Sequence, residues 1–320
     1  MTSAGRAFRF GVINERMSSA AAWADHARRV EDQGYATFLV RDHFAPDFFG
    51  DQFAPVAALM AAASVTRTLS IGSLVFSNDY RHPVVLAKEA ATLDVLSEGR
   101  FELGLGAGWL RCEYEQAGVA FDSPGTRVGR LEESLRVLKG LFGGDAFTFA
   151  GQHYRIADLK GFPRPIQAPH PPILIGAGSP RMLRLAGREA DIVGVLTSST
   201  RTGTLLADPT ERLAAAVAEK VRWIREGAGD RFPRVELSMV IDVVQTDDPD
   251  GAAEALIARR GWRGITPAQV LEMPAIFIGS REQIVDDMEA RRARFGYSYL
   301  IVSDRSMDAL APIVARLAGR

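Results

Sequence analysis

Short apolar runs alternate with amphipathic stretches from one end of the chain to the other. Eight of the apolar runs have the length of strands and contain few polar positions, which is typical of strands buried on both faces. We predict strands at residues 8–13, 36–41, 69–76, 100–106, 172–176, 191–196, 235–244 and 297–303. Such strands, separated by helices, predict a parallel sheet that is covered on both faces.

The amphipathic stretches have the end signals of helices. The stretch at 18–34 opens on serine, a good N-cap, places Trp23, Ala27 and Val30 on one face, and ends at Gly34. The same plan is followed at residues 82–99, 281–296 and 307–319. Each predicted strand is therefore followed by a stretch that can form a covering helix.

Eight βα units fit either an open doubly wound sheet or a closed (β/α)8 TIM barrel. The length of 320 residues is close to that of a barrel, which favours a single barrel domain over residues 1–320. The active site of such a barrel lies on the loops that follow the C-terminal ends of the strands. Candidate functional residues are therefore sought at the strand exits.

Three connections are long enough to be insertions, after strands 4, 6 and 7. In residues 143–171 we predict a hairpin that turns at "AGQH", followed by a proline-rich extended segment. Residues 197–208 form the second insertion, and residues 246–280 carry extra helical pieces. We expect these segments to close over the barrel mouth. For residues 246–280 the alternative is a surface insertion with no role at the site.

Composition narrows the class of protein. A formal net charge of -1 indicates neither nucleic acid nor an anionic membrane as a partner. Cys112 is the only cysteine, which excludes an internal disulfide and a cysteine-based metal cluster and fits a reducing compartment. Neither a signal peptide nor an apolar run of about 18 residues or more is evident. We expect a cytoplasmic protein.

The second strand ends in "VRDHF", which places Asp42 and His43 at a strand exit. An imidazole there can move protons near neutral pH, and the alternative is a histidine that only packs or caps a loop. The other histidines are scattered, and no H-x-H or H-x-x-x-H pair is present. We therefore expect no metal site.

Two glycine-rich segments follow strands. In "GLGAGW" the dinucleotide pattern G-x-G-x-x-G fails, because positions 109 and 111 are Trp109 and Arg111. In "ILIGAGSP" (173–180) the glycines permit a tight turn, Ser179 can cap a helix and Pro180 suits its first position. The amides of such a helix start favour a phosphate, with an unoccupied turn as the alternative; Arg181 and Arg184 could add charge or simply be solvated.

The chain resembles the luciferase-like monooxygenase superfamily, and within it the oxidoreductases that use the deazaflavin coenzyme F420. The likeness rests on residues 40–44, 69–118 and 171–194 and is strongest over 69–118. It implies a barrel that holds a reduced flavin or deazaflavin in its mouth and acts on a small molecule. Members are commonly homodimers, and the apolar helix at 55–65 is a candidate interface, although burial against the barrel explains the same residues.

The resemblance also implies roles for individual residues. His43 would lie beside the ring and take part in proton transfer, accompanied by Asp42. A non-proline cis peptide would fall at Ser73–Leu74, behind the ring. The residues expected to line the ring and its tail, or to bind the phosphate, are Gly106, Ala107, Gly108, Gly176, Ala177, Gly178 and Ser179. Trp109 and Phe44 would shape an apolar substrate pocket.

One position departs from the family. Trp109 stands where the sugar-phosphate dehydrogenases of this branch have a catalytic glutamate, and their phosphate-clamping lysines have no evident counterparts here. Glu113 could substitute only if its side chain points inward. Sugar-phosphate oxidation is therefore not expected.

We predict hydride transfer between F420 and a small organic substrate, in the direction that reduces an activated double bond or imine. The alternatives are a two-component monooxygenase that uses reduced FMN and oxygen, and a non-catalytic carrier on the same barrel. His43 would lie near a peroxyflavin in the first alternative.

Overall fold

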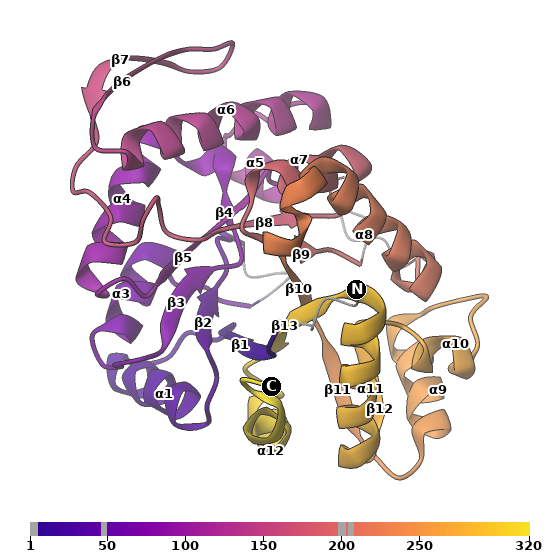
Figure 1. Ribbon diagram of the computed structural model, residues 1–320. Helices are drawn as coiled ribbons and strands as arrows, with labels where there is room; N and C mark the ends of the chain where they lie inside the picture. Colours follow the sequence, from indigo (N-terminus) through magenta and orange to yellow (C-terminus); the bar gives the residue numbers. More distant parts are fainter. Residues whose placement is uncertain (1–5, 46–49, 198–202, 204–207) are drawn as a thin grey trace.

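The computed structural model describes residues 6–45, 50–197, 203 and 208–320, and it has helices arranged around a closed parallel sheet (Figure 1). The barrel strands are β1 (Arg9–Ile13), β2 (Thr37–Val40), β3 (Ser70–Ser73) with β4 (Phe76–Ser77), β5 (Phe101–Gly106), β8 (Ile173–Ala177), β9 (Ile192–Val195), β10 (Glu236–Val240) and β13 (Tyr297–Ser303). Neighbouring strands pair in parallel, and the β3–β5 and β1–β13 pairings close the ring. The predicted (β/α)8 barrel is confirmed.

The third strand is interrupted between β3 and β4 by Leu74 and Val75, which are joined by a non-proline cis peptide bond. The prediction that this bond lies at Ser73–Leu74 is wrong by one residue. Ser73 still belongs to the ladder, where it pairs with Val40, and its hydroxyl donates to the carbonyl of Gly104 at 2.9 Å. The interruption therefore begins after Ser73.

One helix covers each barrel strand. These helices are α1 (Ala20–Asp32), α3 (Pro55–Ala63), α4 (Pro83–Leu96), α6 (Pro124–Phe142), α7 (Pro180–Glu189), α8 (Ala214–Ala228), α11 (Arg281–Phe295) and α12 (Met307–Leu317). Helix α1 has the predicted ends: Ser19 accepts the amide of Ala22 at 3.2 Å, and Gly34 has a φ of 79°. None of the described helices is both long enough and apolar enough to cross a membrane.

The insertion after α6 contains the predicted antiparallel hairpin of β6 (Ala146–Ala150) and β7 (Arg155–Lys160). Helix α5 (Arg111–Ala117), between β5 and α6, was not predicted. Short 3-10 turns occur at η1 (Asn78–Tyr80), η2 (Thr210–Arg212) and η3 (Gly229–Arg234). Of the predicted lid after β9, residues 198–202 and 204–207 lie outside the described residues.

The predicted seventh strand is wrong in its second half. Strand β10 ends at Val240, and β11 (Asp242–Gln245) leaves the barrel to pair in parallel with β12 (Ile276–Gly279). The helices α9 (Pro249–Arg260) and α10 (Pro267–Leu271) complete this insertion. The apolar residue Val244 belongs to this insertion, where it packs against a second small cluster that includes Trp262.

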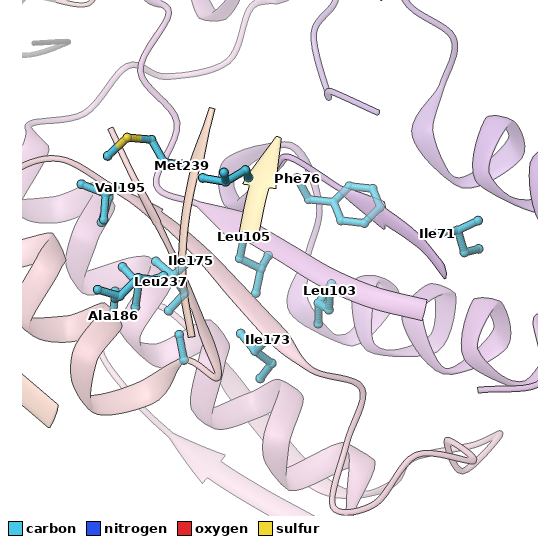
Figure 2. Packing of buried hydrophobic residues seen from close by; sticks show 14 of the residues in the cluster. Ile71, Phe76, Leu103, Leu105, Ile173, Ile175, Ala186, Val195, Leu237 and Met239 are labelled. Carbon is cyan, nitrogen blue, oxygen red and sulfur yellow. The ribbon is translucent and has the colours of Figure 1, made fainter. Parts of the chain in front are cut away.

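Besides the small cluster around Trp262, the described residues form two apolar clusters. Between the strands and the helices lies a large apolar layer, of which Figure 2 shows Leu103, Leu105 and Ile175. Inside the barrel, a smaller cluster contains Ile13, Leu39, Leu174, Ile192, Tyr299 and Ile301. Ile301 of this inner cluster also lines a cavity at the C-terminal ends of the strands.

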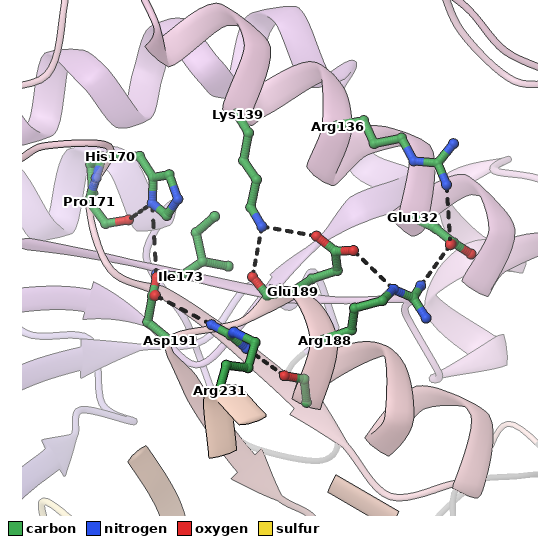
Figure 3. Close-up of polar contacts among 11 residues, drawn as sticks. Glu132, Arg136, Lys139, His170, Pro171, Ile173, Arg188, Glu189, Asp191 and Arg231 are labelled. Atoms are coloured by element: carbon green, nitrogen blue, oxygen red, sulfur yellow. Dashed lines mark hydrogen bonds and ion pairs between the residues drawn. The ribbon is translucent and has the colours of Figure 1, made fainter. Parts of the chain in front are cut away.

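Ion pairs join α6 to α7 on the outside of the barrel (Figure 3). Lys139 donates to the carboxylate of Glu189 at 3.0 Å, and Arg188 pairs with Glu132 at 2.8 Å. Burial raises the pKa of Glu189, but the hydrogen bonds and charges of Lys139 and Arg188 outweigh it and lower the pKa below its usual value. These contacts hold α7 in place, and the first residues of α7 face the barrel mouth.

Glu31, in the last turn of α1, provides a test of the fold. Its Oε1 accepts the amides of Arg67, Thr68 and Leu69 at 2.9, 2.6 and 2.9 Å. Burial raises its pKa, but these bonds outweigh that effect and bring the pKa to about 2. We expect Glu31→Gln to lower the free energy of unfolding by about 1 kcal/mol at pH 7. Because the folded pKa is lowered, the wild-type advantage should be complete above about pH 4.5 and disappear towards pH 2, as measured by urea unfolding.

Candidate active site

A cavity of about 260 Å³ opens at the C-terminal ends of the barrel strands. Most of the predicted site residues line it: Asp42, His43, Leu74, Gly106, Ala107, Gly108, Trp109, Gly176, Ala177, Gly178 and Ser179. Phe44 and Ser73 are not brought into the lining. Phe44 is 57% exposed and stacks on Tyr80 with ring centroids 4.4 Å apart, and Ser73 is buried.

The alternating glycines of β5 make room for protein groups. A Cβ atom on Gly104 would overlap the carbonyl oxygen of Ser73, and one on Gly106 would lie 2.7 Å from the side chain of Val75. Gly108 has a φ of 71° and faces the hydroxyl of Tyr114. These glycines therefore admit the interrupted third strand and α5, and Gly106 and Gly108 also border the cavity.

His43 is held by a buried carboxylate. Its Nδ1 lies 2.8 Å from Oε2 of Glu113, which is 1% exposed and comes from the first turn of α5. The other carboxylate oxygen accepts the amides of Phe44 at 2.8 Å and Ala45 at 3.0 Å. Tyr80 donates its hydroxyl to Oε2 at 3.2 Å.

The protonation of this pair follows from its contacts. Burial raises the pKa of Glu113, but the hydrogen bond from His43 and the backbone amides outweigh it and lower the pKa below its usual value. An ionised carboxylate only accepts hydrogen bonds, so Nδ1 of His43 carries the hydrogen. The nitrogen that can exchange a proton with a molecule in the cavity is then Nε2.

Asp42 holds the backbone beside the cavity. It is 5% exposed, accepts the amide of Ser77 at 3.0 Å and pairs with Arg81 at 2.6 Å. These contacts tie the end of β2 to the end of β4, which places His43 relative to the strand interruption.

Sequence reasoning missed several residues of the lining. Arg41 and Tyr80 lie on the His43 side of the cavity, and Leu196, Ser238, Met239 and Val240 lie at the ends of β9 and β10. Arg41 pairs with Glu15, and burial lowers its pKa to about 10. Burial and the neighbouring Glu113 raise the pKa of Tyr80. The position of Arg41 directly after β2 was the available signal, whereas Tyr80 had none.

The turn after β8 has the predicted form. Ser179 occupies the N-cap of α7 and Pro180 its first position, while the Ser179 side chain makes no cap hydrogen bond and lines the cavity. Arg181 instead donates to the carbonyl of Gly125 at 3.2 Å, and Arg184 pairs with Glu226 at 2.8 Å. The two arginines thus bind neighbouring helices.

Trp109 forms part of the cavity wall beside His43, with ring centroids 6.1 Å apart in an edge-to-face arrangement. Among the described residues, no group of three or more His, Cys, Asp or Glu side chains could hold a metal ion. The chemistry available from the described lining is therefore proton transfer at His43, next to a helix N-terminus suited to an anion.

This fold and site define a (β/α)8-barrel protein with a histidine, held by a buried carboxylate, at the mouth of the barrel. The profile of the luciferase-like monooxygenase family matches residues 7–312, so the chain belongs to that family.

An F420-dependent glucose-6-phosphate dehydrogenase of Kineococcus radiotolerans is 32% identical over 75% of this chain and 67% of its own length. A protein of the same name from Microbacterium testaceum is 32% identical over 87% of this chain and 85% of its own. These matches confirm the resemblance to the F420-dependent branch. The structure of an F420-dependent secondary alcohol dehydrogenase, in complex with an F420-acetone adduct, has the same fold, with a TM-score of 0.78, 18% identity and coverage of 97% of this chain and 99% of that one.

Proposed function

We propose that the protein is an oxidoreductase that uses coenzyme F420 to transfer hydride to a small organic substrate. The observation that carries the proposal is His43, fixed by the ionised and buried Glu113 at the edge of the cavity. A proton-transferring imidazole in the mouth of a barrel fits a two-electron reduction, in which the substrate receives a hydride and a proton. The F420-dependent relatives support the choice of cofactor.

The residues present fit a flat ring with a phosphate tail. Gly176 and Gly194 line the cavity side by side, and a Cβ on Gly194 would lie 3.7 Å from the Cα of Gly176. The side chain of Val75 borders them, 3.6 Å from a Cβ on Gly176. This surface of small residues leaves room for a ring, and the amides at the start of α7, next to Ser179, would bind the phosphate.

The cofactor, when bound, supplies hydride transfer at its ring. His43 would give its Nε2 proton to the substrate atom that needs it, and Glu113 would stabilise the imidazolium form of His43. Asp42 would act as a positioning residue through Ser77 and Arg81. Trp109 would exclude water from one side of the cavity, because its large apolar ring fills that wall.

Reduction is the proposed direction. Trp109 stands where the sugar-phosphate dehydrogenases of the branch have a catalytic glutamate, and the inward-facing Glu113 is engaged with His43. For this reason glucose 6-phosphate, the substrate named for the relatives, is not the proposed substrate.

The test compares two reactions. With F420H2 under anaerobic conditions, we expect activated alkenes or imines to restore the absorbance of oxidised F420, and His43→Ala to abolish this. Oxygen uptake with reduced FMN, without oxidation of F420H2, would favour the monooxygenase alternative. Cofactor binding that survives His43→Ala, with no turnover by the wild type on any substrate tried, would favour the carrier.

We further propose a cytoplasmic homodimer with α3 at its interface. Ala58, Leu59 and Ala62 of α3 are buried against the rest of the chain, which leaves Ala57 and Ala61 on the outer face for a partner. Light scattering should give twice the chain mass of 34.8 kDa. A mass of one chain would contradict the proposed dimer.

A further inference from the structure

The cavity has a second wall, formed by the ends of β9 and β10, which the proposed cofactor residues do not include. Leu196, Met239 and Val240 line it. Leu196 is 41% exposed and Val240 40% exposed, whereas Met239 is 2% exposed and belongs to the apolar layer between the strands and the helices. Large apolar side chains that are left open to a cavity mark a surface for an apolar ligand.

The backbone of this wall is fixed. The amide of Leu196 donates to the carbonyl of Ala177 at 2.8 Å, and its own carbonyl accepts Nζ of the buried Lys220 at 2.7 Å. Val240 pairs with Ile301 in the barrel ladder. The apolar side chains are thus presented by rigid strand ends, which favours a preformed binding surface.

Ser238 lies at the base of the same wall. It lines the cavity, it is 1% exposed, and its Oγ has no hydrogen-bond partner in the part of the chain that the structure describes. A buried hydroxyl without a partner destabilises a fold, so a bound molecule with a hydrogen-bond acceptor would satisfy it.

The charges of the described lining are compensated within the protein. Arg41 pairs with Glu15, Asp42 with Arg81, and Glu113 with His43. A substrate phosphate or carboxylate would therefore have to displace an existing partner. An uncharged substrate avoids that cost.

We infer that the wall of Leu196, Met239 and Val240 binds an uncharged, largely apolar substrate that carries one carbonyl oxygen, and that Ser238 donates a hydrogen bond to this oxygen. The inference rests on the proposed function and specifies its substrate class. Atoms and electrons balance for a conjugated alkene: the β-carbon would gain a hydride from F420H2, the α-carbon would gain a proton through His43, and the C=C π bond would be replaced by two C–H bonds. F420H2 would be oxidised to F420 and would release the second proton.

The first test uses a series of unbranched 2-alkenones that differ by one methylene. In the wild type, KM should fall about two- to fourfold with each added methylene, as apolar burial requires. Val240→Asn should flatten this dependence. The matched control is Val85→Asn, which changes an apolar residue that is 51% exposed in α4 and outside the lining, and it should behave as the wild type.

The second test is Ser238→Ala. KM for every alkenone should rise about 2- to 12-fold, because one hydrogen bond is lost. The dissociation constant for F420 should not change, and the Tm of the ligand-free variant should not fall, because no partner within the protein is lost.

The inference is overturned if glucose 6-phosphate is turned over faster than the alkenones, if KM is insensitive to chain length, or if Ser238→Ala weakens F420 binding and leaves KM unchanged. Loss of F420 binding in the wild type would instead overturn the proposed function. In that case the inference is tested without F420, by the rise in Tm that each alkenone causes. This rise should increase with chain length in the wild type and not in Val240→Asn.

Discussion

Glu113→Gln lowers kcat about 10²- to 10³-fold and leaves the affinity for F420 unchanged. Glutamine has the same shape and can still accept the amides of Phe44 and Ala45. Its amide nitrogen would take the place of Oε2, however, and would donate a hydrogen towards Nδ1 of His43. This contact favours the tautomer of His43 that carries its hydrogen on Nε2 and not on Nδ1. The imidazolium form of His43 would also lose the charge that stabilises it.

The measurement is the single-turnover rate of F420H2 oxidation, together with a fluorescence titration of F420. Glu115→Gln is the matched control, because Glu115 lies in the same helix with a side chain that is 64% exposed. An unchanged rate in Glu113→Gln would contradict the role given to this carboxylate.

The same pair determines a pH dependence. The folded pKa of Glu113 lies below its usual value of 4.5, so its contribution to stability is complete above that value and is lost as the pH falls through the folded pKa. We expect the Tm of the wild type to exceed that of Glu113→Gln at pH 7 and the difference to narrow below about pH 4.5. A difference that grows on acidification would show that the carboxylate is not the stabilised form.

Gly104→Ala lowers the free energy of unfolding by about 3 kcal/mol or more, or prevents folding. A Cβ at this position would overlap the backbone carbonyl of Ser73, and both residues lie in paired barrel strands, so neither can move aside cheaply. Any folded fraction should also bind F420 more weakly, because the strand interruption beside the cavity would shift.

Urea unfolding measures this effect, and Gly125→Ala is its control. Gly125 lies in α6, where a Cβ would be 3.6 Å from the nearest atom, in ordinary contact. That variant should gain about 0.5–1 kcal/mol from the helix preference of alanine. Equal stability of Gly104→Ala and the wild type would contradict the close packing assigned to β5.

The barrel could be predicted because its signal is local and repeated. Each strand is a short apolar run, and each helix has its own start and stop signals, as in the stretch at 18–34. The seventh strand was mispredicted because Val243 and Val244 lie in β11, which pairs with β12 outside the barrel. Val243 packs against the main core, and Val244 packs against the small cluster around Trp262. Periodicity cannot distinguish two neighbouring cores.

The site could be predicted only where backbone position decides it. His43 and Ser179 come shortly after the ends of β2 and β8, and Gly106 is the last residue of β5, so their place in the mouth follows from the fold. The contact between Glu113 and His43 joins residues 70 positions apart and depends on how α5 packs, which no local pattern encodes. Ser238 was missed because a single serine within an apolar strand has no signal until the cavity beside it is known.

The most direct measurement for the central claim is a fluorescence titration of the purified protein with oxidised F420 and, separately, with FMN. The proposed function predicts saturable binding of one F420 per chain, retained in His43→Ala, and much weaker binding of FMN. Tight binding of FMN, with no response to F420, would contradict it.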